Sequence, residues 1–335
     1  MPVTRILCGL LLWLNASVAP ALDIVLTNDD GFETANVRAL YQRLKAAGHD
    51  VIISAPVHNH SGGGGRVEYQ RTIGPLKGPS RYGGVQEGAP GVGTDPQDKD
   101  VYYVDGTPVT AMLHGIDVVA AKRWGGPPDL VISGPNEGGN IGPALVSSGT
   151  FANVLYAINR GIPAVAVSDE PWDKASWKTL TPAARAWAVA DVVVKLVAAL
   201  EAGRAAGAPL LPEDTGLNVN IPALPPDKLA AAPFVMSRLG GVTDFTPMFF
   251  ERLDDSELAR RLGQDSPLPG LSSAIPGEKL PRGVQIPSDA DPRAELNVVH
   301  SGAIAVSVVQ GLPEARRAQQ RAVRRQLQGL IPVDR

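Results

Sequence analysis

Oxygen-bearing side chains follow three short apolar segments of this sequence. Asp29 and Asp30 come directly after the first segment, Ser61 follows the second, and Asn136 follows the third. Carboxylate, hydroxyl and amide oxygens without a converging histidine or cysteine favour a hard cation such as Mg²⁺ or Mn²⁺ over Zn²⁺. Two adjacent carboxylates also repel each other, and a nearby divalent cation offsets that repulsion. These four residues are therefore candidate ligands for one divalent cation per subunit, with Asp29 and Asp30 as the candidate catalytic pair.

The Asp29-Asp30-Gly31 turn is by itself more typical of a hydrogen-bonded turn than of a metal site. Its position in the chain decides between the two interpretations. In an open parallel sheet, ligands bind beyond the carboxyl ends of the strands, and two further polar turns are expected at the same edge. We therefore favour the metal site.

A glycine-rich segment, Ser133–Gly142, precedes a polar stretch at residues 147–150, where a helix is expected to start. Glycines let backbone amides approach an anion, and a helix N-terminus adds unpaired N–H groups and a favourable dipole. A flexible loop followed by a capped helix is the alternative interpretation. We interpret the segment as a phosphate cradle, and its candidate substrate contacts are Asn140, Ser148, Gly149 and Thr150.

A metal beside a phosphate cradle indicates hydrolysis of a phosphomonoester. His58 and His60 lie just before Ser61. His60 is a candidate general acid or substrate contact, and a plain surface histidine is the alternative. The sequence has no Walker A lysine motif and no Gly-x-Gly-x-x-Gly, His-Glu-x-x-His or Gly-x-Ser-x-Gly segment. Nucleoside-triphosphate, dinucleotide, zinc-protease and serine-esterase chemistry therefore lack their usual sequence support.

Predicted strands and helices alternate along the chain. Apolar runs bounded by turn residues predict buried strands at Ile24–Leu26, Val51–Ile53, Leu130–Ser133, Ala164–Ser168, Leu217–Ile221 and Ala303–Val309. Helical spacing of apolar residues predicts helices over 37–44, 109–122, 150–160 and 181–202. Residues 66–104, rich in Gly, Pro and Asp, suggest a hairpin or a long excursion rather than a core element. This alternation predicts an α/β fold with a doubly wound, mostly parallel sheet.

The chain divides into four expected parts. Residues 1–21 are a leader, residues 22–222 an α/β catalytic core, and residues 223–310 an extended arm with a C-terminal β segment. Residues 311–335 contain a final helix over 313–327, which we expect to pack back on the core. Its five arginines indicate a solvated helix face rather than a nucleic-acid contact.

The first residues have the three parts of a secretory signal peptide: Arg5, an apolar run that ends at Leu14, and small residues up to Ala21. A buried helix or a membrane anchor is the alternative, but the run is shorter than the roughly 20 residues that a bilayer core requires. Cleavage after Ala21 predicts a periplasmic or secreted protein with no membrane anchor. The only cysteine, Cys8, leaves with the leader, so the exported chain cannot form a disulfide.

The composition indicates a globular protein and argues against a nucleic-acid polymer as a partner. The chain has 335 residues, with 31 Lys+Arg against 34 Asp+Glu, and a formal net charge of -3. A chain with this balance has no overall positive field to hold a polyanion.

Together these motifs resemble the SurE (survival protein E) family of metal-dependent nucleotidases and acid phosphatases. Leu26–Gly31 is similar to the family's opening turn, and Ala55–Gly62 to its second loop. Ser133–Gly142 with Ser148–Thr150 is similar to its glycine-rich loop, and Leu217–Pro222 to a later strand. The resemblance covers most of the mature chain.

The resemblance implies that the four oxygen-bearing residues hold the metal, and that Asn140 and residues 148–150 meet the phosphate. It implies a Rossmann-like core with a β-hairpin arm and a swapped C-terminal element, which build a homodimer or homotetramer. It also implies 5′/3′-nucleotidase activity, the release of phosphate from nucleoside monophosphates.

The sequence departs from the usual family pattern at three places. The family commonly has an acid where Thr110 stands, an acid and then a Tyr within residues 143–148, and a Glu where Asn159 stands. These departures leave the candidate metal ligands complete and bear on nucleotide preference, rate and assembly contacts.

Two other functions are compatible with the same residues. A nucleoside hydrolase also begins its calcium site with clustered aspartates after a first strand, and it would act on a free nucleoside. A binding protein would keep the fold and the metal without turnover, which the missing family acids favour. Trp172 and Trp177 are candidates for stacking on a base and equally for packing a loop.

Overall fold

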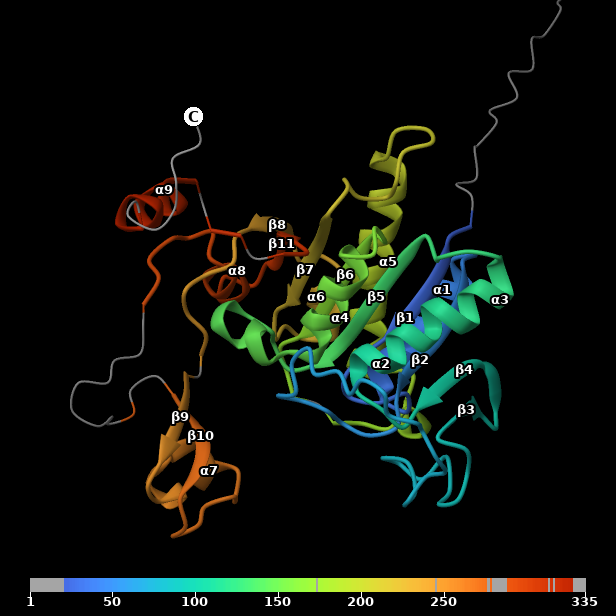
Figure 1. Ribbon diagram of the computed structural model, residues 1–335, viewed down its shortest axis with the longest axis horizontal. Coiled ribbons are helices and arrows are strands. Elements are labelled where there is room, and N and C mark those ends of the chain that lie inside the picture. The colour runs from blue at the N-terminus through green and yellow to red at the C-terminus, as the bar shows by residue number, and fades with distance from the viewer. Residues whose placement is uncertain are drawn as a thin grey trace, which may run out of the picture.

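The computed structural model describes residues 21–172, 174–244, 246–275, 278, 288–312, 314–315 and 317–327. Nearly all of the expected leader, including Cys8, therefore lies outside the described residues. Along the described chain, strands and helices alternate as far as β7, as the sequence predicts, except where β3 and β4 follow β2 directly (Figure 1).

One nine-stranded sheet forms the centre of the molecule, in the order β3-β4-β2-β1-β5-β6-β7-β11-β8. Six of its eight strand pairs are parallel, and β3–β4 and β7–β11 are antiparallel. This confirms the doubly wound α/β fold. The strands are β1 (Asp23–Thr27), β2 (Asp50–Pro56), β3 (Val92–Asp95), β4 (Asp98–Val104), β5 (Leu130–Glu137), β6 (Ala164–Asp169), β7 (Thr215–Ile221), β8 (Phe234–Ser237) and β11 (Ile304–Gln310).

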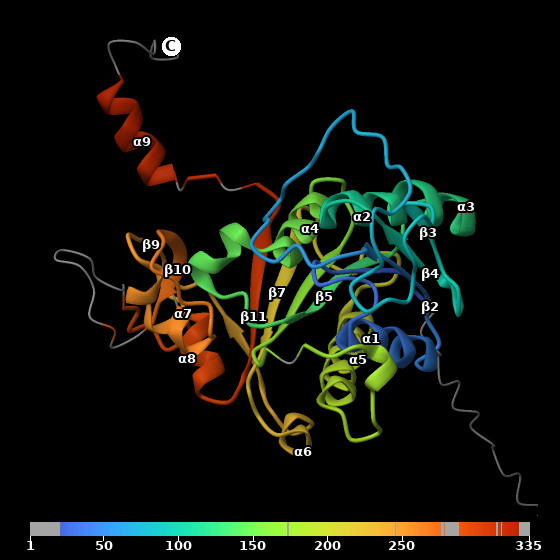
Figure 2. The same ribbon diagram turned by 90° about the horizontal axis from the view of Figure 1, so that it is seen from below.

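Helices cover both faces of this sheet, and each face has its own apolar core (Figure 2). Alternate residues of β1 serve the two cores: Leu26 packs on the side of α1 and α5, and Val25 on the side of α2 and α4. No helix among the described residues is long and apolar enough to cross a membrane. The main helices are α1 (Ala35–Ala46), α2 (Pro108–His114), α3 (Ala121–Trp124), α4 (Gly149–Ile158) and α5 (Arg185–Gly203).

The predicted helix over 109–122 is one helical rod with a π-helical middle, η1 (Gly115–Ala120), between α2 and α3. Gly115 lies directly against the sheet, because a Cβ atom at this position would be 2.8 Å from Cβ of Ser54. The absence of a side chain therefore lets the rod pack close to β1 and β2.

The hairpin expected within 66–104 is present as β3 and β4. Contrary to the expectation of a peripheral excursion, β4 also pairs in parallel with β2 and so joins the main sheet. Val101 and Val104 are fully buried, which provides the apolar surface for that pairing. The sequence signal was weak because the apolar run of β4 is short and follows a long segment rich in Gly, Pro and Asp.

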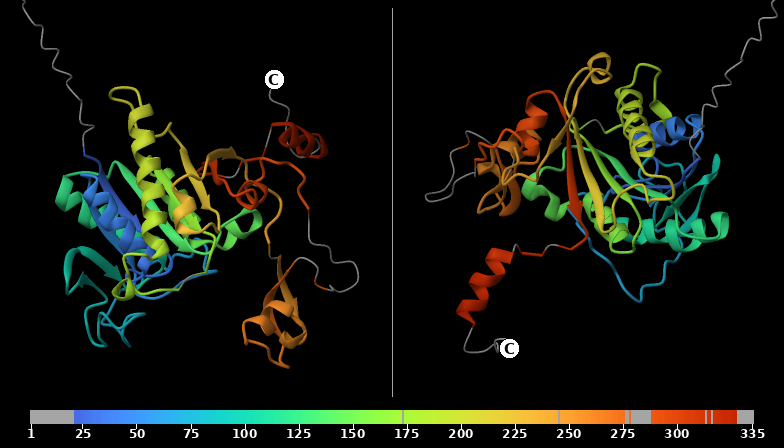
Figure 3. Two further views of the ribbon diagram at one scale, coloured as in Figure 1. Left: turned by 180° about the vertical axis from the view of Figure 1, so that it is seen from behind. Right: turned by 90° about the horizontal axis from the view of Figure 1, so that it is seen from above.

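The expected arm over 223–310 is only partly separate from the core. The projecting part is the antiparallel hairpin of β9 (Thr246–Phe250) and β10 (Gly270–Ala274), with the short helix α7 (Glu257–Arg261) between them (Figures 1 and 3). Strands β8 and β11 belong to the main sheet instead. They are linked through α8 (Glu295–His300), whose Val298 and Val299 are buried.

The C-terminal helix does not pack back on the core as expected. Helix α9 (Arg317–Gln326) has no buried residue and lies apart from the sheet in Figures 2 and 3. Its sequence, RAQQRAVRRQ, has only Ala318, Ala322 and Val323 as apolar residues. These do not make an apolar stripe wide enough to bury a helix against a sheet.

We predict that Ile132→Ala, in the middle of β5, lowers the free energy of unfolding by about 2–5 kcal/mol. Ile132 is fully buried in the core beside α1 and α5, so the truncation leaves a cavity. Chemical denaturation measures this change. Leu271→Ala on the exposed face of the arm is the control and should change the unfolding free energy by less than about 0.5 kcal/mol, because Leu271 is 71% exposed. An equal loss in both variants would contradict the assigned core.

Candidate metal and phosphate site

The loops after β1, β2 and β5 meet at the carboxyl edge of the sheet. The backbone N–H of His60 donates to the carbonyl of Asp29 at 2.8 Å, and that of Gly64 donates to the carbonyl of Ser147 at 2.9 Å. A cavity of about 310 Å³ opens at this edge. The side chains and backbone that line it are those of Asp29, Ser61, Gly62, Asn136, Glu137, Gly138, Gly139, Asn140, Ala144, Ser147, Ser148, Trp172, Pro247, Leu258 and Ser273.

The Asp29 carboxylate is held by the N-terminus of α4. The Thr150 hydroxyl donates to Asp29 Oδ1 at 2.5 Å, and the backbone N–H groups of Gly149 and Thr150 also bond the carboxylate. Burial raises the pKa of Asp29, and these hydrogen bonds oppose the rise. Gly149 has to be a glycine for this contact, because a Cβ atom there would lie 2.7 Å from Asp29 Cβ.

Asn136 is brought next to Asp29 by the same hydroxyl. The Asn136 amide nitrogen donates to the carbonyl of Gly138 at 2.7 Å, which fixes the orientation of the amide. Its Oδ1 then lies 3.2 Å from the Thr150 hydroxyl, which is the group that bonds Asp29. The two acceptor oxygens are therefore neighbours, as a shared cation requires.

Asp30 is buried beside this pair but is not among the residues that line the cavity. Its carboxylate accepts hydrogen bonds from the backbone N–H of Glu137 at 3.0 Å and from the Asn59 amide at 3.2 Å. Burial, together with the charges of Asp29 and Glu137, raises its pKa well above the usual value. The structure thus brings Asp29, Ser61 and Asn136 into one cavity, and Asp30 as a direct ligand stays a prediction.

Two charged residues of this site were not found from the sequence. Glu137 lines the cavity, and the guanidinium of Arg81 donates to its carboxylate at 2.8 Å and to the Asp30 carbonyl at 2.6 Å. Glu137 follows Asn136 within the glycine-rich segment, and its position there was an available signal. Arg81 carried no such signal, because it lies in an irregular segment far from the motifs.

The charge balance of the site fits a divalent cation. Asp29, Asp30 and Glu137 are buried acids, whereas Arg81 is the cation that lowers the pKa of Asp30 and pairs with Glu137. Buried carboxylates without compensating charge are costly. Asp29, Ser61 and Asn136 line the cavity, and their carboxylate, hydroxyl and amide groups are oxygen donors of the kind that Mg²⁺ or Mn²⁺ prefers.

The loop that carries Asn140 is fixed by polar residues of β7 and α8. Asn218 and Asn220 both donate to the Asn140 carbonyl, at 3.1 and 2.9 Å. Glu295 accepts from Asn218 at 2.7 Å and from the N–H of Gly142 at 3.2 Å. Burial raises the pKa of Glu295. A residue distant in the sequence therefore stabilises the glycine-rich loop.

The structure gives the start of α4 a role that differs from the predicted phosphate cradle. The Ser148 hydroxyl accepts from the N–H of Phe151 at 3.0 Å and caps the helix. The N–H groups of Gly149 and Thr150 are directed to Asp29, and Thr150 is fully buried. Gly149 and Thr150 therefore position a candidate metal ligand, whereas Ser148 lines the cavity together with Asn140.

His60 lies next to the site without lining the cavity. Its ring is partly buried, and this burial lowers the pKa of the imidazole. A role of His60 as a general acid or substrate contact stays a prediction. Its observed contact with the site is the backbone bond to Asp29.

The three departures from the family pattern fall in different places. The Thr110 hydroxyl bonds the hydroxyl of Thr107 at the start of α2, and Asn159 donates to the carbonyl of Gly311. Neither Thr110 nor Asn159 lines the cavity, whereas Ala144 does. Among these departures, the one within residues 143–148 is therefore the one that changes the cavity wall.

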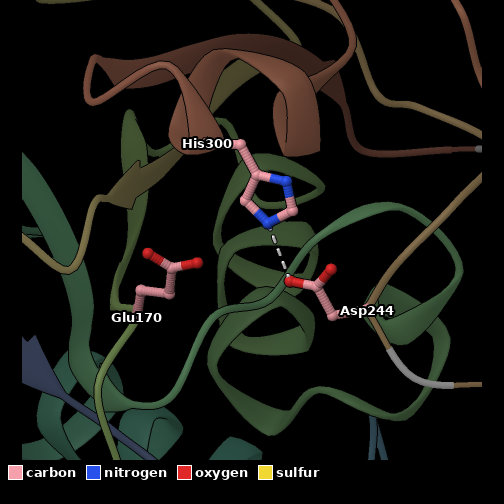
Figure 4. A group of neighbouring side chains, drawn as sticks. All are labelled: Glu170, Asp244 and His300. Atoms are coloured by element: carbon pink, nitrogen blue, oxygen red, sulfur yellow. Dashed lines mark hydrogen bonds and ion pairs between the residues drawn. The ribbon is translucent and has the colours of Figure 1, made fainter. Parts of the chain in front are cut away.

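A second group of possible ligands lies apart from the cavity lining. Glu170, Asp244 and His300 come from three distant segments and point toward one another (Figure 4), with one ligand atom of each within 4.8 Å of the others. The His300 Nε2 atom is 3.0 Å from Asp244 Oδ2, and Glu170 accepts from the N–H of Ala223 at 2.8 Å. These contacts account for the side chains without an ion, so we assign no metal to this group.

These features define an α/β protein with an oxygen-donor site at the carboxyl edge of its sheet. A model of the family described as "Survival protein SurE" matches residues 24–241. The chain therefore belongs to the SurE family. It is also similar in fold to the crystal structure of the SurE protein from Aquifex aeolicus, with a TM-score of 0.62 and 23% identity over 90% of this chain and 98% of that one.

Curated relatives carry two names. An acid phosphatase of Yarrowia lipolytica is 37% identical over 206 residues, which are 59% of this chain and 56% of the relative. The matched region thus spans little more than half of that phosphatase. A 5′-nucleotidase SurE of Synechococcus is 29% identical over 71% of this chain and 74% of its own length. A 5′-nucleotidase SurE of Geobacter metallireducens is 33% identical over 63% of this chain and 69% of its own length.

We predict that Gly149→Ala weakens cation binding by about 10–100-fold, because the new methyl group displaces the Asp29 carboxylate. The rise in melting temperature across a Mn²⁺ titration measures this change. The control is Gly203→Ala at the end of α5, where a Cβ atom meets nothing within 4 Å. Equal Mn²⁺ affinity in both variants would show that the close approach of α4 to Asp29 is not needed for binding.

We also predict that a divalent cation stabilises the protein more at about pH 7.5 than at about pH 5.5. The raised pKa values of Asp29 and Asp30 mean that the metal-free folded protein binds protons that the unfolded chain releases. Stability of the metal-free protein therefore rises as pH falls through the raised pKa values. A cation has to displace those protons. Thermal melts with and without Mn²⁺ test this, and a pH-independent shift would contradict it.

Proposed function

We propose that this protein is a divalent-metal-dependent phosphomonoester hydrolase that releases phosphate from nucleoside 5′- or 3′-monophosphates. The main support is the convergence of Asp29, Ser61 and Asn136 on one cavity, beside the buried carboxylates of Asp30 and Glu137, of which Glu137 pairs with Arg81. Its relatives named 5′-nucleotidase and acid phosphatase support the same reaction class.

The residues of the site have different roles in the proposed reaction. Asp29, Ser61 and Asn136 would hold the cation, and Asp30 adds negative charge next to Asp29. When bound, the cation would lower the pKa of a coordinated water and offset charge on the phosphoryl group. Asn140 and Ser148 line the same cavity, and we expect them to contact the phosphate oxygens. The hydrogen bonds of Thr150 and Gly149 keep Asp29 oriented before the substrate binds.

Two further features of the proposal concern the whole protein. Export to the periplasm or the exterior is supported by the signal-peptide pattern of residues 1–21. A homodimer or homotetramer is supported by the projecting hairpin of β9 and β10 and by the exposed helix α9, which are surfaces available to a second subunit.

The deciding experiment is phosphate release from 5′-AMP by purified protein with Mg²⁺ or Mn²⁺. We expect activity that EDTA abolishes and that added metal restores. Asp29→Ala and Asp30→Ala should each lower kcat by at least about 100-fold, since both remove charge from the metal site. Asp227→Ala, which removes an exposed acid of α6 (Pro226–Leu229), is the matched control and should leave kcat unchanged.

Each other outcome points to a different function. Release of free base and ribose from a nucleoside, with Ca²⁺ dependence, would establish a nucleoside hydrolase instead. Tight nucleotide binding by calorimetry without phosphate release would establish a binding protein that has lost turnover. No release from any nucleoside monophosphate with either metal would reject the proposal.

A further inference from the structure

Trp172 exposes a large apolar ring in the same cavity as the candidate metal ligands. The residue lies three positions beyond the end of β6, and its side chain is 54% exposed. It lines the cavity together with Asp29, Asn136 and Asn140. An exposed indole lacks part of the hydrophobic stabilisation that burial would give. The exposure of Trp172 next to a polar site therefore suggests that the ring contacts a ligand.

The indole is held in place by the glycine-rich loop. A Cβ atom at Gly138 would lie 1.9 Å from Trp172 Nε1 and 2.3 Å from its Cδ1. Gly138 also has φ of 115°, a backbone conformation that favours glycine. The ring edge therefore rests on the backbone two residues after Asn136. This contact sets the ring at a defined position relative to the metal site.

The other described tryptophans do not line this cavity. Trp172 also has a neighbour of its own, because Lys174 Nζ lies 5.8 Å from the centroid of its ring. The Nε1 groups of Trp124 and Trp187 donate to Asp50 and to the carbonyl of Thr181, both at 2.9 Å. The guanidinium of Arg38 lies 4.4 Å from the ring centroid of Trp177. Trp177 therefore packs a loop, and of the two residues considered for base stacking, Trp172 is the one at the site.

The cavity thus combines two kinds of surface. Oxygen donors from the ends of β1 and β5 make the polar part. Trp172 from the loop after β6, with Pro247 and Leu258 from the arm, adds apolar lining. A volume of about 310 Å³ is at the small end of ligand pockets. A phosphate ester with one flat aromatic group matches both parts, whereas a fully hydroxylated leaving group matches only the polar part.

We propose that Trp172 stacks on the base of the nucleoside monophosphate and so makes the enzyme selective for phosphomonoesters whose leaving group carries a planar aromatic base. This inference rests on the proposed phosphatase activity. Stacking is tolerant of base identity, since every base has a π-face. Trp172 therefore discriminates between esters with and without a base, and only weakly among bases.

The test compares 5′-AMP with ribose 5-phosphate, which has a hydroxyl at C1 in place of the base. We expect Trp172→Ala to lower kcat/KM for 5′-AMP by at least about fivefold, mainly through KM, with little change for ribose 5-phosphate. Trp172→Phe should recover most of the loss because it restores an aromatic face. Trp187→Ala is the matched control, because Trp187 lies outside the cavity. This variant should change kcat/KM by the same factor for both substrates.

A second measurement does not depend on hydrolysis. Adenosine should quench the tryptophan fluorescence of the wild-type protein and of Trp187→Phe, and quench Trp172→Phe much less. An equal loss of kcat/KM for both substrates in Trp172→Ala, or quenching that persists in Trp172→Phe, would overturn the inference. If no phosphomonoester is hydrolysed while adenosine still quenches Trp172, the proposed function fails and the stacking site stands.

Discussion

Burial of neighbouring carboxylates at the end of β1 is the constraint on which the rest of the site depends. Asp29 and Asp30 are both almost completely buried, and their pKa values are raised. The N-terminus of α4 holds Asp29, and the backbone of Glu137 holds Asp30. These hydrogen bonds orient the two acids without neutralising them. A cation bound at the cavity would take the place of the protons that these raised pKa values retain in the metal-free protein.

The neighbouring elements hold this charged edge of the sheet in position. Strand β7 supplies Asn218 and Asn220, which hold the glycine-rich loop, and α8 supplies Glu295, which bonds Asn218 and the backbone of Gly142. The same loop carries Gly138, on which Trp172 rests. The polar site and its apolar wall are thus positioned by one loop. Movement of that loop would change metal binding and substrate contact together.

Most of the fold was predictable because apolar runs and helical spacing are local properties of the chain. The strand that precedes Asp29 and the first half of the strand that holds Asn136 were located in this way, and so was the helix after Ser148. The placement of β8 and β11 was not predictable, because strand order depends on contacts between distant segments. The role of Arg81 escaped notice for the same reason: its partners Asp30 and Glu137 lie far away in the sequence.

The sequence by itself determined the chemical types at the site: acids, a hydroxyl, an amide and glycines at turns after buried strands. Only the tertiary structure decided how those groups are used. It directed the first amides of α4 to Asp29 instead of leaving them for an anion, and it placed Trp172 rather than Trp177 in the cavity. The physical reason is that residue type follows from the chain alone, whereas hydrogen-bond partners and exposure are set by which segments pack together.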